Sequence, residues 1–401
     1  MPHRIALTLL LVFAVAPLEA FDDDFGISEV ELKEESFLDI NAHGFRKSLD
    51  LEWREQLNGW RMGGGSTSTD RAFIRTDLRL YHELSEALMV SLDWDQDEFY
   101  APKPTPAPIA AVHVYPFDQT DIGLAIQGEP DLDKRQSDFG YALIFGRQPH
   151  NFVKVTLVEI DKFWNSKNSL DNSFYRRPGE LISIEGSYDL NERWQIDFEL
   201  EQDQPLDFVF TDQISSFQYE AEDYQTRLIF RQTEELIYGL NLRSLRVNKN
   251  LTQTQSDQSQ QIEYRSFDLY RISQFDPENE LTLGARFDDI EDQVADAIDP
   301  AASYRFDLNT RQVYATWYHS YSTHQAWDLG LYIGYSDRRK TFAVANSVQF
   351  DQSSVQGKLR TSWQYQSADK SAVLVISISL NLDDLADDPG DGGGLYFQKR
   401  F

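Results

Sequence analysis

The sequence predicts an all-β protein, a transmembrane antiparallel up-and-down β-barrel of about 18 strands (16–18). Three observations lead to this prediction. Apolar and polar residues alternate with a period of two through most of the chain, many alternating runs are long, and short polar turns alternate with longer polar connections. In a β-strand such alternation gives one apolar and one polar face, whereas no convincing run of apolar residues at helical spacing is found.

The alternation is clearest in five segments, which are 49–57, 88–94, 194–200, 327–335 and 355–365. A soluble antiparallel sandwich would show the same alternation, but its strands have about 5 to 6 residues. A tilted strand needs about 9 to 11 residues to cross a membrane. The length of these runs therefore favours membrane-spanning strands.

The connections between the runs are of two kinds. Short polar turns are expected at 84–86, 117–120, 147–151, 189–192, 232–235, 276–279, 321–324 and 367–370. Longer connections are expected at 59–70, 101–108, 129–136, 165–172, 202–213, 248–261, 292–302, 338–347 and 383–394. With a first strand at 45–58 and a last one at 394–401, this gives 18 strands. Transmembrane barrels have short periplasmic turns and longer extracellular loops, so both ends of the barrel domain would lie on the periplasmic side.

The first residues have the pattern of a secretory signal peptide. Arg4 precedes an apolar run from Ile5 to Val15, and a small residue, Ala20, ends the segment. We expect residues 1–20 to be a signal peptide, 21–44 to form a periplasmic N-terminal segment and 45–401 to form the barrel.

Composition narrows the classes of partner. The chain has 37 Lys and Arg against 66 Asp and Glu, a formal charge of −29, so binding to nucleic acid is not expected. Cysteine is absent, so disulfides do not contribute to stability. Aromatic residues make up 13% of the chain, and tryptophans such as Trp53, Trp194, Trp317 and Trp327 fit the interfacial girdle of a membrane barrel.

The last strand, "GLYFQKRF", resembles the C-terminal assembly signal of Gram-negative outer-membrane β-barrels. Gly394 is followed by Leu395 and Phe397 on one face, and the chain ends at Phe401. Lys399 lies on the same face and departs from the pattern, although a lysine near a strand end can extend its ammonium to the membrane interface. The resemblance implies a location in the cell outer membrane, with outer-membrane lipid, lipopolysaccharide and the barrel-assembly machinery as partners.

The strand count and the early segment "SLDLEWREQLNGW" also resemble the alginate-export family of outer-membrane barrels. This resemblance implies passive export of an anionic exopolysaccharide through the lumen, a polysaccharide or periplasmic export partner, no cofactor, and luminal arginines that solvate sugar carboxylates. Candidate pore-lining residues on the polar faces are Arg54, Arg75, Arg79, Arg243, Arg286, Lys358, Arg360, Asp93, Asp95, Asp197 and Glu199. Their mixed signs oppose a purely anion-selective pore, because neighbouring rings of opposite charge neutralise each other.

Three alternative functions stay open at this point: a general or solute-specific porin, a structural barrel that sheathes a periplasmic partner, and, less favoured, a barrel enzyme. None of the seven histidines has metal-ligand spacing such as H-E-x-x-H. The acidic stretch 383–394 lacks the order of an EF-hand and fits a hydrated loop bridged to lipopolysaccharide by divalent ions. We therefore expect no catalytic residues and no bound metal.

Overall fold

A computed structural model describes residues 45–67, 72–97, 109–116, 121–130, 137–160, 174–177, 179–210, 214–342, 347–383, 385 and 390–401. The predicted signal peptide (1–20) and N-terminal segment (21–44) lie outside these residues. The described chain is almost entirely strand, with one helix at its start and one short 3-10 turn.

The elements follow the chain in this order: α2 (Lys47–Arg54), β1 (Gly59–Thr67), β2 (Ala72–Ser85), β3 (Leu88–Asp97), β4 (Ile109–Val114), β5 (Ile122–Pro130), β6 (Ser137–Arg147), β7 (His150–Glu159), β8 (Phe174–Arg177), β9 (Glu180–Asn191), β10 (Trp194–Val209), β11 (Ser216–Thr233), β12 (Leu236–Gln253), β13 (Ser256–Asp276), β14 (Asn279–Asp296), η3 (Pro300–Ala302), β15 (Tyr304–Ser320), β16 (Gln325–Phe342), β17 (Ser347–Gln366), β18 (Ala372–Asn381) and β19 (Gly390–Arg400).

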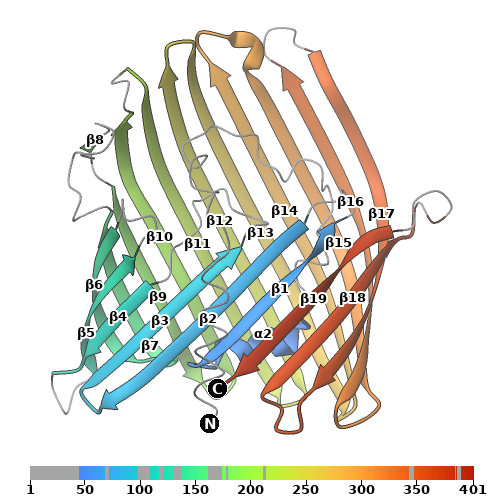
Figure 1. The fold of residues 1–401 in the computed structure, drawn as a ribbon. Coiled ribbons are helices and arrows are strands. Elements are labelled where there is room, and N and C mark those ends of the chain that lie inside the picture. The colour runs from blue at the N-terminus through green and yellow to red at the C-terminus, as the bar shows by residue number, and fades with distance from the viewer. Residues whose placement is uncertain are drawn as a thin grey trace.

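The strands form one closed antiparallel sheet (Figure 1). β1 pairs with β2 on one side and with β19 on the other, and this pairing closes the barrel. Of the 19 strands, β8 and β9 lie end to end along β10, so the ring has 18 positions. The predicted fold class and strand count are confirmed.

The two kinds of connection lie at opposite ends of the barrel. Seven of the predicted short turns overlap the breaks between described strands, and the eighth, at 117–120, lies outside the described residues between β4 and β5. The seven described turns and the C-terminus lie together at the bottom of Figure 1. We call this the short-turn end and the other the long-loop end.

The strands from β10 to β17 are much longer than predicted, with 16 to 21 residues each. At about 3.3 Å per residue they span roughly 50–70 Å, and in Figure 1 they rise above the strands on the near side. The predicted connections at 202–213 and 248–261 were therefore mostly wrong, since β10, β12 and β13 run through them. Beyond the membrane both faces of a strand can be polar, so the alternation that marks a strand disappears.

The first strand was also predicted in the wrong place. Residues 47–54 form the helix α2, and β1 occupies 59–67, part of which was predicted to be a loop. Within the described part of the chain, no helix has the length and apolar character needed to cross a membrane.

Candidate functional site

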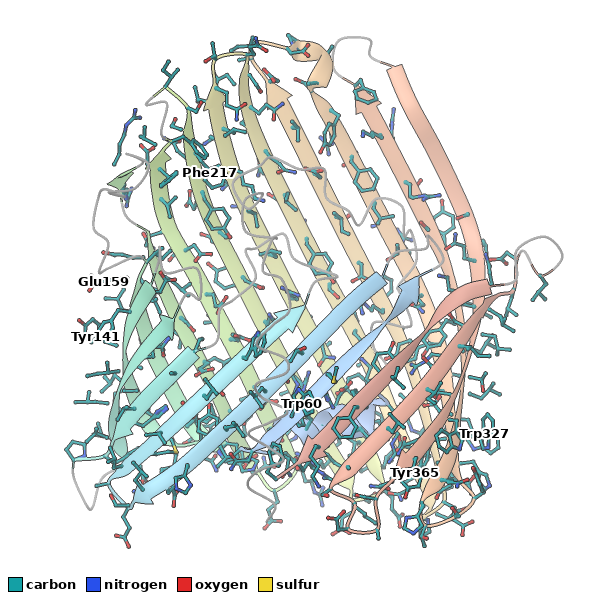
Figure 2. The ribbon with its side chains drawn as sticks, viewed as in Figure 1. Trp60, Tyr141, Glu159, Phe217, Trp327 and Tyr365 are labelled. Carbon is teal, nitrogen blue, oxygen red and sulfur yellow. The ribbon has the colours of Figure 1, made fainter. Side chains whose placement is uncertain are left out.

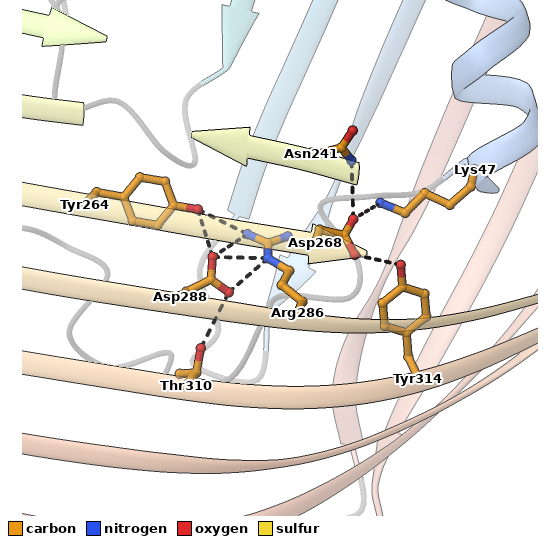
Figure 3. Close-up of polar contacts among 8 residues, drawn as sticks. All are labelled: Lys47, Asn241, Tyr264, Asp268, Arg286, Asp288, Thr310 and Tyr314. Atoms are coloured by element: carbon orange, nitrogen blue, oxygen red, sulfur yellow. Dashed lines mark hydrogen bonds and ion pairs between the residues drawn. The ribbon is translucent and has the colours of Figure 1, made fainter. Parts of the chain in front are cut away.

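The inner wall of the barrel is polar, and its charges are joined in clusters. Asp268 on β13 is the centre of one cluster (Figure 3). Its carboxylate accepts hydrogen bonds from Lys47 Nζ on α2 (2.6 Å), Tyr314 Oη on β15 (2.8 Å) and Asn241 Nδ2 on β12 (3.4 Å). The carboxylate of Asp268 therefore joins the helix α2 to side chains of β12 and β15.

A second cluster in Figure 3 neutralises Arg286. Its guanidinium donates two hydrogen bonds of 2.9 Å to the two carboxylate oxygens of Asp288, two residues along β14. Tyr264 Oη also donates to Asp288 (2.9 Å), and Thr310 Oγ1 donates at 3.5 Å. On β12 Arg243 makes a similar two-point contact with Asp223 of β11, at 3.2 and 2.9 Å.

Paired charges also line the inner wall from β2 to β9. Lys154 Nζ lies 2.8 Å from Glu185 Oε1, and Tyr81 Oη donates to Asp93 Oδ2 at 3.1 Å. Arg79 donates to Asp77 Oδ1 at 3.2 Å. The Lys154–Glu185 and Arg79–Asp77 pairs place a cation beside a carboxylate, so most of their field cancels locally.

The helix α2 lies inside the barrel near the short-turn end (Figure 1). Trp53 donates its indole N–H to Asp77 Oδ2 on β2 at 2.6 Å and is almost completely buried. Arg61 of β1 donates to Asp50 at 2.8 Å, and Ser48 Oγ donates to Glu280 of β14 at 3.0 Å. The helix is thus bound directly to the inner wall.

Tyrosine rings lie over glycines on the inner wall. A Cβ atom added at Gly239 or Gly284 would lie only 2.1 Å or 2.2 Å from Cζ of Tyr270 or Tyr314, respectively. Glycine at these positions lets the ring lie flat against the neighbouring strand, an arrangement that compensates for the missing side chain. The hydroxyl of Tyr314 is thereby held in reach of Asp268.

Two luminal arginines lack a carboxylate partner among the described residues. Arg54 at the C-terminal end of α2 is exposed and makes no hydrogen bond or ion pair there. Arg227 of β11 donates Nε to the neutral amide of Asn241 (2.9 Å), and its Nη1 is buried without a hydrogen-bond partner. Enclosure by the barrel and the nearby charges of Arg227 and Arg79 lower the pKa of Arg54.

Three carboxylates, those of Asp50, Asp197 and Glu199, interact electrostatically with Arg54, and two of them have other hydrogen-bond partners. Asp50 accepts from Arg61, and Asp197 accepts from Ser187 Oγ at 2.8 Å and from the side chain of Gln195 at 3.0 Å. Both acids raise the pKa of Arg54, which offsets part of the opposite effect. The end of α2 therefore brings together two arginines, Arg54 and Arg227, that have no hydrogen-bonded carboxylate among the described residues.

The outer face of the barrel is apolar and exposed. Among its residues, Ile126 is 53% exposed, Val313 57% and Ile378 55%. The same exposed class includes Val112, Leu124, Leu143, Val155, Leu157, Ile182, Leu242, Leu269, Leu283, Phe287, Leu329, Leu331, Ile333, Ile376 and Leu395. In water so large an apolar surface would cause association, whereas a closed barrel with an apolar outer belt is stable in lipid.

The chain is therefore a closed β-barrel with the outer surface of a membrane-spanning protein. Aromatic side chains flank its apolar belt at the short-turn end, where Trp317, Trp327 and Tyr365 are exposed, and Figure 2 shows Trp327 and Tyr365 on the outside of the wall. Trp53 was wrongly predicted to belong to this girdle, since it lies inside the lumen on α2.

No family model and no curated protein matches the chain. Among solved structures, the barrel is similar to OmpT (in-vitro folded), an outer membrane protein of Vibrio cholerae, with 6% identity and a TM-score of 0.38 over 85% of this chain and 96% of that one. It is also similar to a bacterial polysaccharide outer membrane secretin, with 10% identity and a TM-score of 0.37 over 86% and 99%. A third is the translocator domain of autotransporter NalP from Neisseria meningitidis, with 8% identity and a TM-score of 0.32 over 71% and 90%.

The apolar residues of the predicted assembly signal, Leu395, Phe397 and Phe401, lie on the outer face of the barrel. Leu395 and Phe401 are exposed by 55% and 67%, and the ring of Phe397 lies 5.6 Å from Trp60 of β1 in an edge-to-face contact. The ammonium of Lys399 donates to the hydroxyl of Ser371 in the turn before β18. The one residue that departs from the signal pattern is therefore held at the short-turn end by a polar partner.

The predicted pore-lining residues occupy different environments. Arg79, Arg243, Arg286, Asp93, Asp197 and Glu199 lie on the inner wall, as do Lys358 and Arg360, which are 8% and 4% exposed. For Arg75 and Asp95 the structure describes the backbone, in β2 and β3. Arg54 was predicted on a strand but belongs to α2. Whether these residues line a conducting pore stays a prediction.

Sequence reasoning missed Arg227 and Lys47. Arg227 lies two residues before Ile229 in β11, so both side chains are on the inward face, and Leu228 between them is on the outward face. Only the absence of a carboxylate partner sets Arg227 apart from the other arginines, and that feature depends on contacts across strands. Within the described ranges, no group of three or more metal-binding side chains is found.

Proposed function

We propose that this barrel is a passive outer-membrane channel that exports an anionic exopolysaccharide through its lumen. The observation that supports the proposal is the pair Arg54 and Arg227, which have no carboxylate partner among the described residues. A free guanidinium in an enclosed, partly desolvated site favours a planar carboxylate, to which it can donate two parallel hydrogen bonds. A uronate residue of a passing polymer supplies such a carboxylate.

The proposal includes the route to the membrane and the partners. Residues 1–20 direct export, the short-turn end faces the periplasm, and the barrel-assembly machinery inserts the chain through its C-terminal strand. Lipid and lipopolysaccharide then surround the apolar belt, and a periplasmic export partner delivers the polymer to the short-turn end.

Planar-bilayer recording tests the channel function. The channel should conduct, and short anionic oligosaccharides should block its current, whereas neutral oligosaccharides of equal length should not. Because a hydrogen-bonded charge pair contributes about 1.5–3 kcal/mol, Arg54→Gln or Arg227→Gln should weaken the block by about 10-fold or more. Arg243→Gln is the matched control, since Asp223 already neutralises that arginine.

A general or solute-specific porin is the second candidate, and the paired charges of the inner wall favour it. Arg243–Asp223 and Arg286–Asp288 leave little net field for selecting one sign of ion. A porin would conduct ohmically without block by anionic oligosaccharides. A barrel that sheathes a partner would not conduct by itself, so conductance separates the three functions.

A further inference from the structure

The helix α2 is buried on two opposite sides. Successive helix residues are about 100° apart, so Leu49 and Trp53 share one side and Leu51 lies nearly opposite. Leu49 belongs to a buried cluster with Phe45 of the preceding segment and, on the inner wall, with Val375 of β18 and Tyr396 of β19. These contacts place one side of α2 on the part of the wall where the barrel closes.

The other side of α2 faces a distant part of the wall. Leu51 packs in a cluster with Ile229 of β11 and with Tyr270 and Ile272 of β13. In the ring of 18 positions, β19 is eight positions from β11 and β18 is five positions from β13. A single helix therefore bridges two separate parts of the wall across the lumen.

Ion pairs strengthen both sides of this bridge. Glu55, directly after α2, accepts from Arg231 of β11 at 2.6 Å, and Glu52 accepts from Arg400 of β19 at 3.2 Å. On the β13 side, Lys47 pairs with the buried carboxylate of Asp268 at 2.6 Å. A segment that leaves and enters its site during transport would have to break all of these contacts and expose three apolar side chains together.

We infer that α2 is a fixed partition that joins β18, β19, β1 and β2 to β11–β14 and divides the lumen near the short-turn end. The route of the polymer rests on the proposed function. If the barrel exports a polymer, the polymer passes on the side of α2 that is lined by β2–β10. That side carries Lys154, Glu185 and Asp93, and it borders the C-terminal end of α2 at Arg54.

Thiol labelling tests the partition without depending on conductance. The chain has no cysteine, so single-cysteine variants carry a unique thiol. Val375→Cys lies in the buried cluster that contains Leu49, at a position that is 3% exposed. Ser187→Cys, on the inner face of β9, is the matched control on the side proposed for transport. Each full-length variant, inserted in lipid vesicles and shown to be folded by heat-modifiable gel mobility, is treated with a membrane-impermeant maleimide.

A fixed partition predicts that Val375→Cys reacts about 100-fold more slowly than Ser187→Cys. In a Leu49→Asp/Leu51→Asp background, the reaction at Val375→Cys should rise towards that of the control. Equal rates at the two cysteines in the parent background would show that α2 leaves the wall readily and would overturn the inference. If the disrupted background does not fold, the comparison in the parent background decides alone.

Conductance separates this inference from the proposed function. With α2 disrupted, a channel should conduct about twofold more, because the partition no longer narrows the lumen. Folded barrels that never conduct would refute the channel function, while the labelling ratio would still report whether α2 is fixed.

Discussion

The carboxylate of Asp268 offers the sharpest test of how α2 is held. Asp268→Asn removes the charge that pairs with Lys47 but keeps an oxygen that can accept from Tyr314. The side chain of Asp268 is only 6% exposed, and that of Lys47 is 28% exposed, so solvent screens this pair weakly. A hydrogen bond to a charged group contributes about 1.5–3 kcal/mol, and we expect a loss of about 2 kcal/mol in the free energy of unfolding.

Asp307→Asn is the matched control for this measurement. Asp307 pairs with Arg305 at 3.0 Å, but on the outer face at the long-loop end, where the two side chains are 42% and 54% exposed. Exposed pairs contribute about 0–1 kcal/mol. Equilibrium urea unfolding in detergent micelles, followed by tryptophan fluorescence, gives both values. A cost for Asp268→Asn no greater than that for Asp307→Asn would refute the claim that Lys47 and Asp268 hold the helix.

Three further predictions concern other parts of the barrel. Gly284→Ala should destabilise by about 1–3 kcal/mol in the same urea assay, because the added methyl group meets the ring of Tyr314. Phe401→Ser should reduce the fraction of heat-modifiable barrel recovered in outer membranes, since this exposed ring belongs to the lipid-facing end of β19; unchanged recovery would contradict the assembly-signal interpretation. Hydrogen bonds from Ser367 and other groups of the same turn lower the pKa of Asp369. The parent protein should therefore have a larger free energy of unfolding than Asp369→Asn above about pH 4, and this difference should disappear as the pH falls further.

The sequence predicted the barrel because lipid and water impose a period of two on every membrane-spanning strand. Trp194 to Leu200 and Trp327 to Tyr335 alternate as they do because one face of β10 and β16 meets lipid and the other meets the lumen. The same rule fails outside the membrane. In β12 and β13, all residues of 248–261 except Leu251 are polar, so their pairing could be seen only in the register of the two strands.

The helix α2 could not be distinguished from a strand by its pattern. Leu49, Leu51 and Trp53 are spaced by two, as in a strand with one buried face. On a helix this spacing puts apolar side chains on opposite sides, which is unfavourable on an ordinary protein surface but is stable here because the lumen supplies two walls. The pattern for an amphipathic helix assumes a single buried face, and that assumption fails inside a narrow barrel.

The charges of the lumen show why the number of arginines and carboxylates in the sequence did not predict the ion selectivity of the proposed channel. The candidate residues predicted from sequence included both arginines and carboxylates, and the mixture opposed an anion-selective pore. In the structure, Arg243 and Arg286 are each matched by an aspartate within hydrogen-bonding distance, so these pairs add little to the field that a permeant polymer meets. The field depends on the few cations whose partners are neutral or absent, such as Arg227 and Arg54. Because the two lie near the end of α2, the helix that narrows the lumen also brings their charges close together, and selectivity and pore size should change together when α2 is disrupted.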